Sequence, residues 1–302
     1  MKLLRNKKTV VVHSGNFHAD DVFAVAILAM YLGYLPKIFR TREEKIIKKA
    51  DYVLDVGRVY NPKENKFDHH GEGWNEKRDN GVLYASAGLV WKEYGVKICA
   101  SDEIINIIDE KVIQGIDAND NGMDLPKDSA MNIKAYSIFD YVYSQNPTWR
   151  EDNNSDKVFK KIVKIAQGMM NREIVVAKDY IAGQKRVLDI YNKSKDKRIL
   201  VLDKNYNYAK VVEDLSEVLL IIKPEFVSGN WHINTVSIKG TLFQARMDLP
   251  AKWAGKYEVE LQKITGIKEV IFCHNRRFIS VCKTRESAIK LAQLALKEIN
   301  NK

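Results

Sequence analysis

TVVVHSGNFHADDVFAVAILAMYLG, residues 9–33, carries the strongest secondary-structure signal in the chain. Its opening run, Thr9 to His13, is short, apolar and β-branched, which is typical of a strand buried on both faces of a sheet. Ser14-Gly-Asn breaks this strand, and a helical pattern then extends from about Asp20 to Gly33, where glycine is a common stop. The stretch therefore predicts a strand, a turn and a buried helix.

Two further short strands, Ile38 to Thr41 and Tyr52 to Val56, follow with a charged helical stretch between them. Strands that alternate with helices predict an α/β fold with a mostly parallel sheet. Ligands bind such sheets at the carboxyl ends of the strands. His13 ends the first strand and Asp55 ends the third, so we expect both side chains at one edge.

The chain is long enough for two domains. We expect a catalytic domain over residues 1–190, whose last part, 157–191, is a long connecting helix. After the polar linker Asn192-Lys-Ser-Lys-Asp-Lys197, residues 197–302 alternate strands with a closing helix. They predict a smaller C-terminal α/β domain of about 110 residues.

Composition narrows the class of protein. The 302 residues are 45% hydrophobic and 29% charged, a balance typical of globular rather than disordered chains. A net charge of +10 favours polyanionic partners, although the basic residues are spread along the chain. The longest apolar run, Val22 to Leu35, is shorter than the roughly 20 residues of a membrane helix. No signal peptide is evident, so we expect a cytoplasmic protein without a membrane segment.

Aspartate and histidine residues gather in four places. Four of the six histidines fall within the first 70 residues, each near an aspartate. Imidazole and carboxylate ligands together suit Mn²⁺ and similar divalent metals, and two such ions can activate water for attack on phosphorus. The four groups are His13 to Asp21, Asp55, Asp68-His69-His70, and Asp117-Ala-Asn-Asp120.

Each group also has a purely structural interpretation. Asp20 and Asp21 could cap a helix, and Asp55 could form a buried salt bridge. Asp117 and Asp120 could be turn residues before Gly122. The combination, in this order, favours a metal site.

The ordered set resembles the motifs of the DHH phosphoesterase superfamily, and within it the Myg (melanocyte-proliferating gene) family, metal-dependent hydrolases described as RNA exonucleases. The resemblance spans nearly the whole chain and implies a DHH-type N-terminal domain. The matching segments are His13–Asp20, Arg40–Arg42, Val53–Gly57, Phe67–His70, Ser86–Leu89, Ile116–Gly122, Pro147–Trp149, Ile271–His274 and Lys283–Glu286.

The resemblance implies two metals, Mn²⁺ with Mg²⁺ or Co²⁺ as alternatives, bridged by Asp55. The ligands of the first would be His13, His18 and Asp55, and those of the second Asp20, Asp55, His69 and Asp117, with Asp120 as the alternative to Asp117. His70 would contact the scissile phosphate or the leaving group, and Asp68 would orient a neighbouring imidazole. His18 stands where most of the superfamily has aspartate, a change that the Myg branch shares.

The C-terminal domain of the superfamily supplies groups that bind substrate. Here the resemblance implies substrate contacts from six residues: Arg42, Arg246, His274, Arg276, Arg277 and Arg285. The segment 274–278 could equally be a solvated hairpin turn, and Trp253 could either stack on a base or be buried. Ser280-Val281 replaces a glycine pair that relatives often have, which leaves the approach of substrate open.

The resemblance, supported by the positive charge, implies a metal-dependent hydrolase, a 3′-5′ exonuclease or oligonucleotide phosphodiesterase that cuts single-stranded RNA with water activated by two metals. Two alternatives are a small-molecule phosphoesterase that acts on pyrophosphate or a nucleotide, and a metal-stabilised binding protein without turnover. The oligomeric state does not follow from the sequence.

Overall fold

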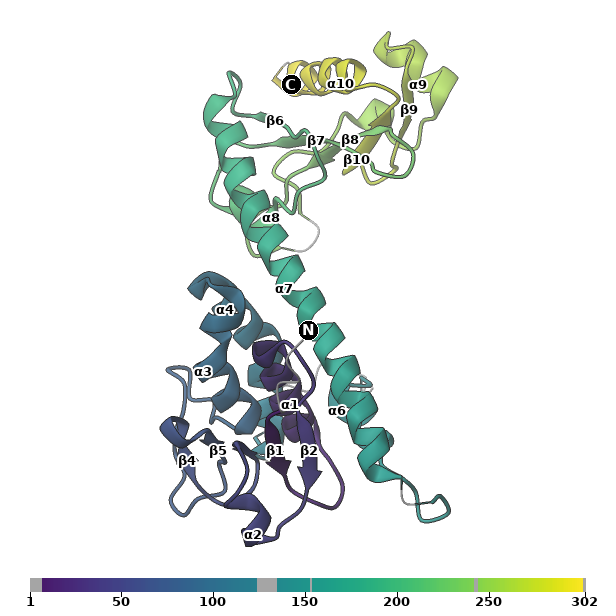
Figure 1. Ribbon diagram of the computed structural model, residues 1–302. Helices are drawn as coiled ribbons and strands as arrows, with labels where there is room; N and C mark the ends of the chain where they lie inside the picture. Colours follow the sequence, from purple (N-terminus) through teal and green to yellow (C-terminus); the bar gives the residue numbers. More distant parts are fainter. Residues whose placement is uncertain (1–6, 124–134, 153, 242–243, 301–302) are drawn as a thin grey trace, which may run out of the picture. The chain divides into compact units, whose positions relative to one another are not determined.

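The computed structural model describes residues 7–123, 135–152, 154–241 and 244–300. The chain divides into two compact units, Met1–Lys178 and Asp179–Lys302. The division falls within the long helix α7, Ser155–Lys193, which the sequence predicts at about residues 157–191. Each unit is an α/β assembly around a sheet of its own (Figure 1).

The sheet of the first unit has the strand order β2-β1-β3-β5-β4. Strand β1 pairs in parallel with β2 and β3, and β3 pairs in parallel with β5, whereas β4 is antiparallel to β5, so the sheet is mixed. The sequence did not predict β4 and β5, because two residues are too few to show an alternating pattern. The strands are Thr9–Val12 (β1), Lys37–Arg40 (β2), Tyr52–Leu54 (β3), Tyr60–Asn61 (β4) and Lys66–Phe67 (β5).

Helices cover both faces of this sheet. On one face α1 packs against α3, and both contact strands. On the other face Val11 and Val53 form a small core with Ile47 of α2, because alternate residues of a strand point to opposite faces. Gly33, at φ 76°, ends α1 in the left-handed conformation that glycine adopts without strain. These helices are Ala19–Leu32 (α1), Glu44–Ile47 (α2) and Ser86–Cys99 (α3).

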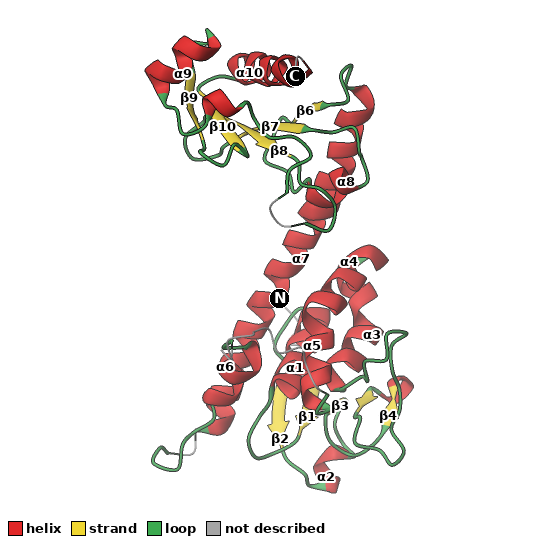
Figure 2. Ribbon diagram, turned by 180° about the vertical axis from the view of Figure 1, so that it is seen from behind, coloured by secondary structure: helices red, strands yellow, loops and turns green. Residues whose placement is uncertain are grey.

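A further helical segment of the first unit is continuous from α4 (Asp102–Ile108) through a π-helical turn, η2 (Asp109–Ile113), into α5 (Gln114–Asp120). The alternative that Asp117 and Asp120 are turn residues before Gly122 is wrong, because both lie on α5, one turn apart. Figure 2 shows α4 and α5 beside α1 and α3, and the short helices η1 (Pro62–Glu64) and α6 (Ile138–Ser144) complete the unit.

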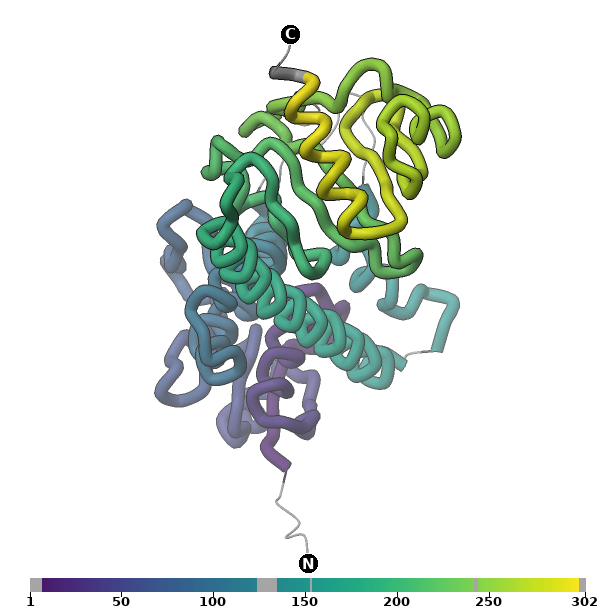
Figure 3. Tube along the Cα trace, turned by 90° about the horizontal axis from the view of Figure 1, so that it is seen from above, coloured from purple at the N-terminus to yellow at the C-terminus, as the bar shows by residue number. Residues whose placement is uncertain are grey.

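The second unit contains a sheet of order β6-β7-β8-β10-β9, in which β6 and β7 are parallel and the other neighbours are antiparallel. Helix α10 (Arg285–Asn300) packs across β7, β8, β9 and β10 (Figure 3). The strands are Ile199–Val201 (β6), Leu220–Pro224 (β7), Trp231–Thr235 (β8), Val270–Cys273 (β9) and Ile279–Cys282 (β10). The other helices are Ala209–Glu213 (α8), Ala251–Trp253 (η3) and Glu258–Thr265 (α9).

Both faces of this second sheet are apolar. Leu220, Ile233 and Trp253 belong to a core that α10 closes, and Val187 of α7 packs with Ile221 on the opposite face. Among the described residues, no helix combines the length and the apolar character that crossing a membrane requires.

Candidate metal centre

Three parallel strands of the first unit end at the same edge, and each is followed directly by potential ligands. His13 follows β1, Asp55 follows β3, and Asp68-His69-His70 follow β5. Because the carboxyl ends of neighbouring parallel strands lie side by side, these groups meet although they are up to 57 residues apart in the chain. The short strand β5 is the element that brings the third group to this edge.

Asp55 adopts a backbone conformation that is uncommon for a residue other than glycine. Its φ is 54°, in the left-handed region, which costs about 1–3 kcal/mol and persists only where the surroundings enforce it. Its N–H donates to the carbonyl of Phe67 at 3.0 Å, so the turn is tied to β5. This turn directs the buried carboxylate of Asp55 towards the histidines.

The first group that could hold a metal consists of His13, Asp21 and Asp55. His13 Nε2 lies 3.2 Å from Asp21 Oδ2 and 3.4 Å from Asp55 Oδ2. His13 Nδ1 lies 3.1 Å from the carbonyl of Ser14 and can donate to it, which leaves the lone pair of Nε2 facing the carboxylates. Burial lowers the pKa of His13 to about 4, so the ring is in its neutral, metal-binding form.

The second group consists of Asp20, His69 and Asp120. His69 Nε2 lies 3.2 Å from Asp120 Oδ2 and 3.8 Å from Asp55 Oδ1. The two oxygens of Asp55 therefore point to different groups, Oδ2 towards His13 and Oδ1 towards His69. This is the geometry expected of a carboxylate that bridges two cations.

The electrostatics of the cluster fit a cation. Burial, and then repulsion from Asp20 and Asp21, raise the pKa of Asp55 well above its ordinary value. Burial likewise raises the pKa of Asp20 and of Asp120 to about 6. His13 Nε2 and Asp21 Oδ2 are buried and have no hydrogen-bond partner. A divalent cation between them would satisfy both atoms and compensate the buried negative charge.

Asp68 holds His70 in a fixed orientation. Asp68 Oδ1 lies 2.8 Å from His70 Nδ1, and Asp68 also accepts the backbone N–H groups of His70 and Arg58. Burial alone would raise the pKa of Asp68, but these hydrogen bonds outweigh it and lower the pKa, and the same contact raises the pKa of His70. Because Nδ1 is engaged and the side chain is 55% exposed, Nε2 of His70 is left for an outside group.

A third group that could hold a metal consists of Asp55, His69 and His70. Asp117 lies outside all three groups and is engaged in a buried network. Its Oδ2 is 2.7 Å from Arg78 Nη2, and its Oδ1 accepts the N–H of Gly88 at 2.9 Å. Arg78 also donates twice to Asp109 at 2.7 Å. This network positions α5, so that Asp120 and not Asp117 reaches the cluster.

We expect that Arg78→Met destabilises the protein by about 3–5 kcal/mol, because it leaves Asp117 buried without a compensating charge. Urea denaturation followed by circular dichroism measures this loss. Arg198→Met is the control, since Arg198 pairs with the exposed Asp196 and the loss of this pair should change stability little. Equal stability of the two variants would contradict the role given to Arg78.

His18 lies at the rim of the cluster. Its side chain is 48% exposed, and its Nδ1 is 3.8 Å from Asp120 Oδ1. The loop that carries it is held by Asn146, whose side chain accepts the N–H of Phe17 and donates to its carbonyl, each at 2.9 Å. Asn146 is 129 residues away in the sequence, so no local pattern could reveal this contact.

The predicted substrate residues of the second unit fall into two kinds. Arg246 donates to four backbone carbonyls of its own unit, which is typical of a structural arginine, and Trp253 is fully buried, so it cannot stack on a base. His274 and Arg276 line a pocket of about 700 Å³. The carbonyls that Arg246 contacts belong to Val212, Glu213, Leu215 and Val218.

Two other predicted residues of this unit have partners. Arg277, at φ 61°, forms an ion pair with Asp248 at 2.7 Å, and Arg285 lies over the ring of Trp231 at 6.0 Å. Arg42 belongs to the first unit and lines a pocket beside Asp55 and His70.

Known proteins are similar to this chain over almost its whole length. The family model MYG1_exonuc, described as "Uncharacterised protein family (UPF0160)", matches residues 9–296. A "MYG1 protein" of Dictyostelium discoideum is 31% identical and covers 94% of this chain and 95% of its own length. One from Saccharomyces cerevisiae is 31% identical, with 96% of each covered, and a "MYG1 exonuclease" of Homo sapiens is 25% identical, with 94% and 84% covered. The chain therefore belongs to the MYG1_exonuc family.

Proposed function

We propose that this protein is a metal-dependent phosphodiester hydrolase of the DHH type, an exonuclease that acts on single-stranded RNA or oligonucleotides. The observation that carries the proposal is Asp55, which directs one oxygen to each of two groups that could hold a metal. The name "MYG1 exonuclease" of the mouse and human relatives supports the same reaction class.

The residues fit two divalent cations, for which we propose Mn²⁺ on the basis of the mixed imidazole and carboxylate set. His13 and Asp21 would hold one, Asp20, His69 and Asp120 the other, and Asp55 both. When bound, such ions polarise a phosphoryl oxygen and lower the pKa of the attacking water.

The side chains of the protein would orient the substrate and supply a proton to the leaving 3′-oxygen. The oxygen of water forms a bond to phosphorus and the water releases a proton to solvent, while the bond from phosphorus to the 3′-oxygen breaks and that oxygen takes up a proton. His70, held through Nδ1 by Asp68, is placed to contact the phosphate and to supply this proton through Nε2. The raised pKa of His70, which arises from its hydrogen bond with Asp68, favours the protonated ring.

A small-molecule phosphoesterase is the second candidate. A pocket of about 730 Å³ beside Asp55 and His70 is large enough for a mononucleotide or pyrophosphate. Purified protein with Mn²⁺ is incubated with 5′-labelled single-stranded RNA or with pyrophosphate. Stepwise shortening of the RNA, abolished by a chelator, supports the exonuclease, and phosphate release from pyrophosphate alone supports the second candidate. If neither substrate reacts, the proposed hydrolase is wrong.

His70→Asn is expected to lower kcat for RNA about 10²–10⁴-fold while Mn²⁺ still binds, because only the phosphate contact and proton donor are lost. Single-turnover assays measure the rate, and calorimetry measures metal binding. His232→Asn, in the second unit, is the matched control and should keep the wild-type rate. Full activity of His70→Asn would show that His70 has no part in the reaction.

A further inference from the structure

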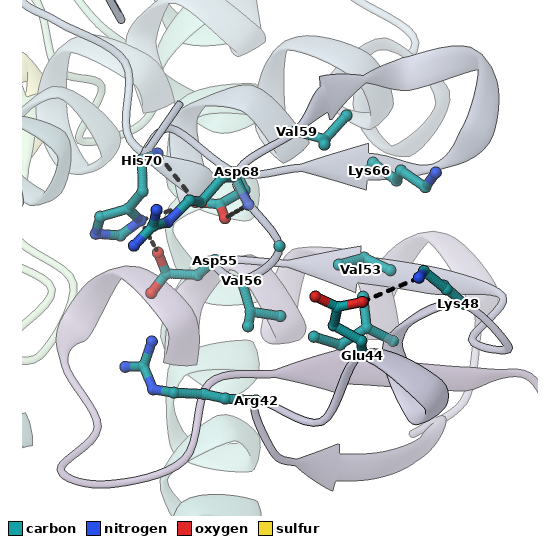
Figure 4. A pocket seen from close by; sticks show the side chains of 13 residues that line it. Arg42, Glu44, Lys48, Val53, Asp55, Val56, Val59, Lys66, Asp68 and His70 are labelled. Carbon is teal, nitrogen blue, oxygen red and sulfur yellow. Dashed lines mark hydrogen bonds and ion pairs between the residues drawn. The ribbon is translucent and has the colours of Figure 1, made fainter. Parts of the chain in front are cut away.

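A pocket of about 730 Å³ lies within the first unit, next to the metal cluster. Asp55, Asp68 and His70 line it on the side of the cluster, and its remaining walls come from α2, the turn after β3 and strand β5. Figure 4 shows Arg42, Asp55 and His70 on one side of this pocket, and the pair Glu44–Lys48 on the other.

The basic side chains that line the pocket differ in whether they have an acidic partner. Lys48 is paired with Glu44 at 2.9 Å, and Lys66 is paired with Glu64, so their charges are largely compensated. In contrast, the exposed side chains of Arg42 and Arg58 form no ion pair or hydrogen bond with any residue that the structure describes. Guanidinium groups bind phosphate through paired hydrogen bonds, so two uncompensated arginines beside the cluster favour an anionic ligand.

Aliphatic side chains form another part of the wall. Ile47, Val53, Val56 and Val59 line the pocket. Val53 and Val56 are buried, so the accessible apolar surface comes from Val59, which is 44% exposed, and from the half-buried Ile47. A planar, weakly polar group such as a nucleobase would cover this surface, whereas a phosphate or pyrophosphate would leave it in contact with water. The pocket thus offers an apolar wall and an arginine pair for two parts of one ligand.

We infer that this pocket binds the terminal nucleotide of the strand, which leaves as a nucleoside 5′-monophosphate. The inference rests on the proposed function and extends it to the group that is released. The phosphate lies between His70 and the guanidinium groups of Arg42 and Arg58, and the base lies against Val59. A site that encloses one nucleotide selects for strand ends.

Calorimetry with the Mn²⁺-loaded full chain tests this inference, with AMP, inorganic phosphate and adenosine as probes. AMP is expected to bind at least about tenfold more tightly than phosphate or adenosine, since it occupies both parts of the pocket. Arg58→Gln and Arg42→Gln should each weaken AMP binding about tenfold, while Val59→Glu places a charge on the base wall and should abolish it. Lys49→Gln, an exposed change beside α2 that does not line the pocket, is the control.

The possible outcomes distinguish a failure of the proposed nucleotide site from a failure of the proposed exonuclease activity. If the arginine variants bind AMP as tightly as the wild type, or if phosphate binds as tightly as AMP, the nucleotide site is wrong even when RNA is hydrolysed. If AMP binding shows the expected pattern but no RNA is cut, the nucleotide site stands and the exonuclease is wrong. The substituted side chains are exposed or at the pocket surface, and circular dichroism checks that each variant is folded.

Discussion

Asp55→Asn is expected to lower kcat/KM for RNA at least about 10³-fold, more than the roughly 10–100-fold cost of losing a residue that only supports a metal ligand. The two carboxylate oxygens of Asp55 lie 3.4 Å from His13 Nε2 and 3.8 Å from His69 Nε2. Asparagine keeps the shape of the side chain but removes the charge and one of the two oxygens. This one substitution should therefore lower the metal affinity of both groups.

Metal binding distinguishes this effect from unfolding. The number of Mn²⁺ ions bound per chain, measured by calorimetry, should fall in Asp55→Asn. Without metal, this variant should be at least as stable as the wild type, because the change removes a buried charge that burial and Asp20 disfavour. Asp51→Asn is the matched control, since its carboxylate binds Lys8 and Thr9 instead of the cluster. Wild-type metal content in Asp55→Asn would refute the bridging role.

Gly88→Ala is expected to destabilise the protein by about 3–5 kcal/mol, because it combines overpacking with disruption of a buried ion pair. A Cβ atom at Gly88 would lie 1.9 Å from Asp117 Oδ2 and 2.9 Å from Arg78 Nη2. Asp117 and Arg78 form an ion pair with each other, so neither side chain can move away from the new methyl group without breaking that pair. Either α3 shifts away from α5, which loosens their packing, or the ion pair between Asp117 and Arg78 opens.

Gly168→Ala is the matched control. Gly168 is also in a helix, α7, but a Cβ there meets no atom within 4 Å among the described residues, apart from the backbone of its own helix. This change should stabilise the protein by up to about 1 kcal/mol, the difference in helix propensity. Urea denaturation of both variants measures the free energy of unfolding. A stable Gly88→Ala variant would show that α3 and α5 do not pack this closely.

Much of the fold could be predicted from local patterns. Residues 9–33 contain β1 and α1, and the strands predicted at 38–41 and 52–56 overlap β2 (Lys37–Arg40) and β3 (Tyr52–Leu54). These segments are long or apolar enough for periodicity to reveal them, and the carboxyl-end rule then predicts that His13 and Asp55 share an edge. Strand β5 was not predicted, because its two residues have no pattern of their own and depend on pairing with β3.

Some of the candidate metal ligands could be predicted from the sequence, and others could not. The resemblance implied His13, His18, Asp20, Asp55 and His69 as ligands, and all of these except His18 occur in groups that could hold a metal. It left Asp117 and Asp120 open, since only two residues separate them and both precede a glycine. The structure places Asp120 in the cluster and Asp117 beside Arg78. Asp21, which the sequence presented as a helix cap, faces His13.

The sequence by itself determined the chemistry: a set of aspartates and histidines in an order that predicts divalent metals, at the ends of strands that local periodicity reveals. Only the tertiary structure decided which atoms face one another. The contacts of Arg78 with Asp117, Asn146 with Phe17 and Asp20 with α3 each join segments 39 to 129 residues apart. Such contacts depend on the packing of helices and strands, and no local pattern of residues encodes them.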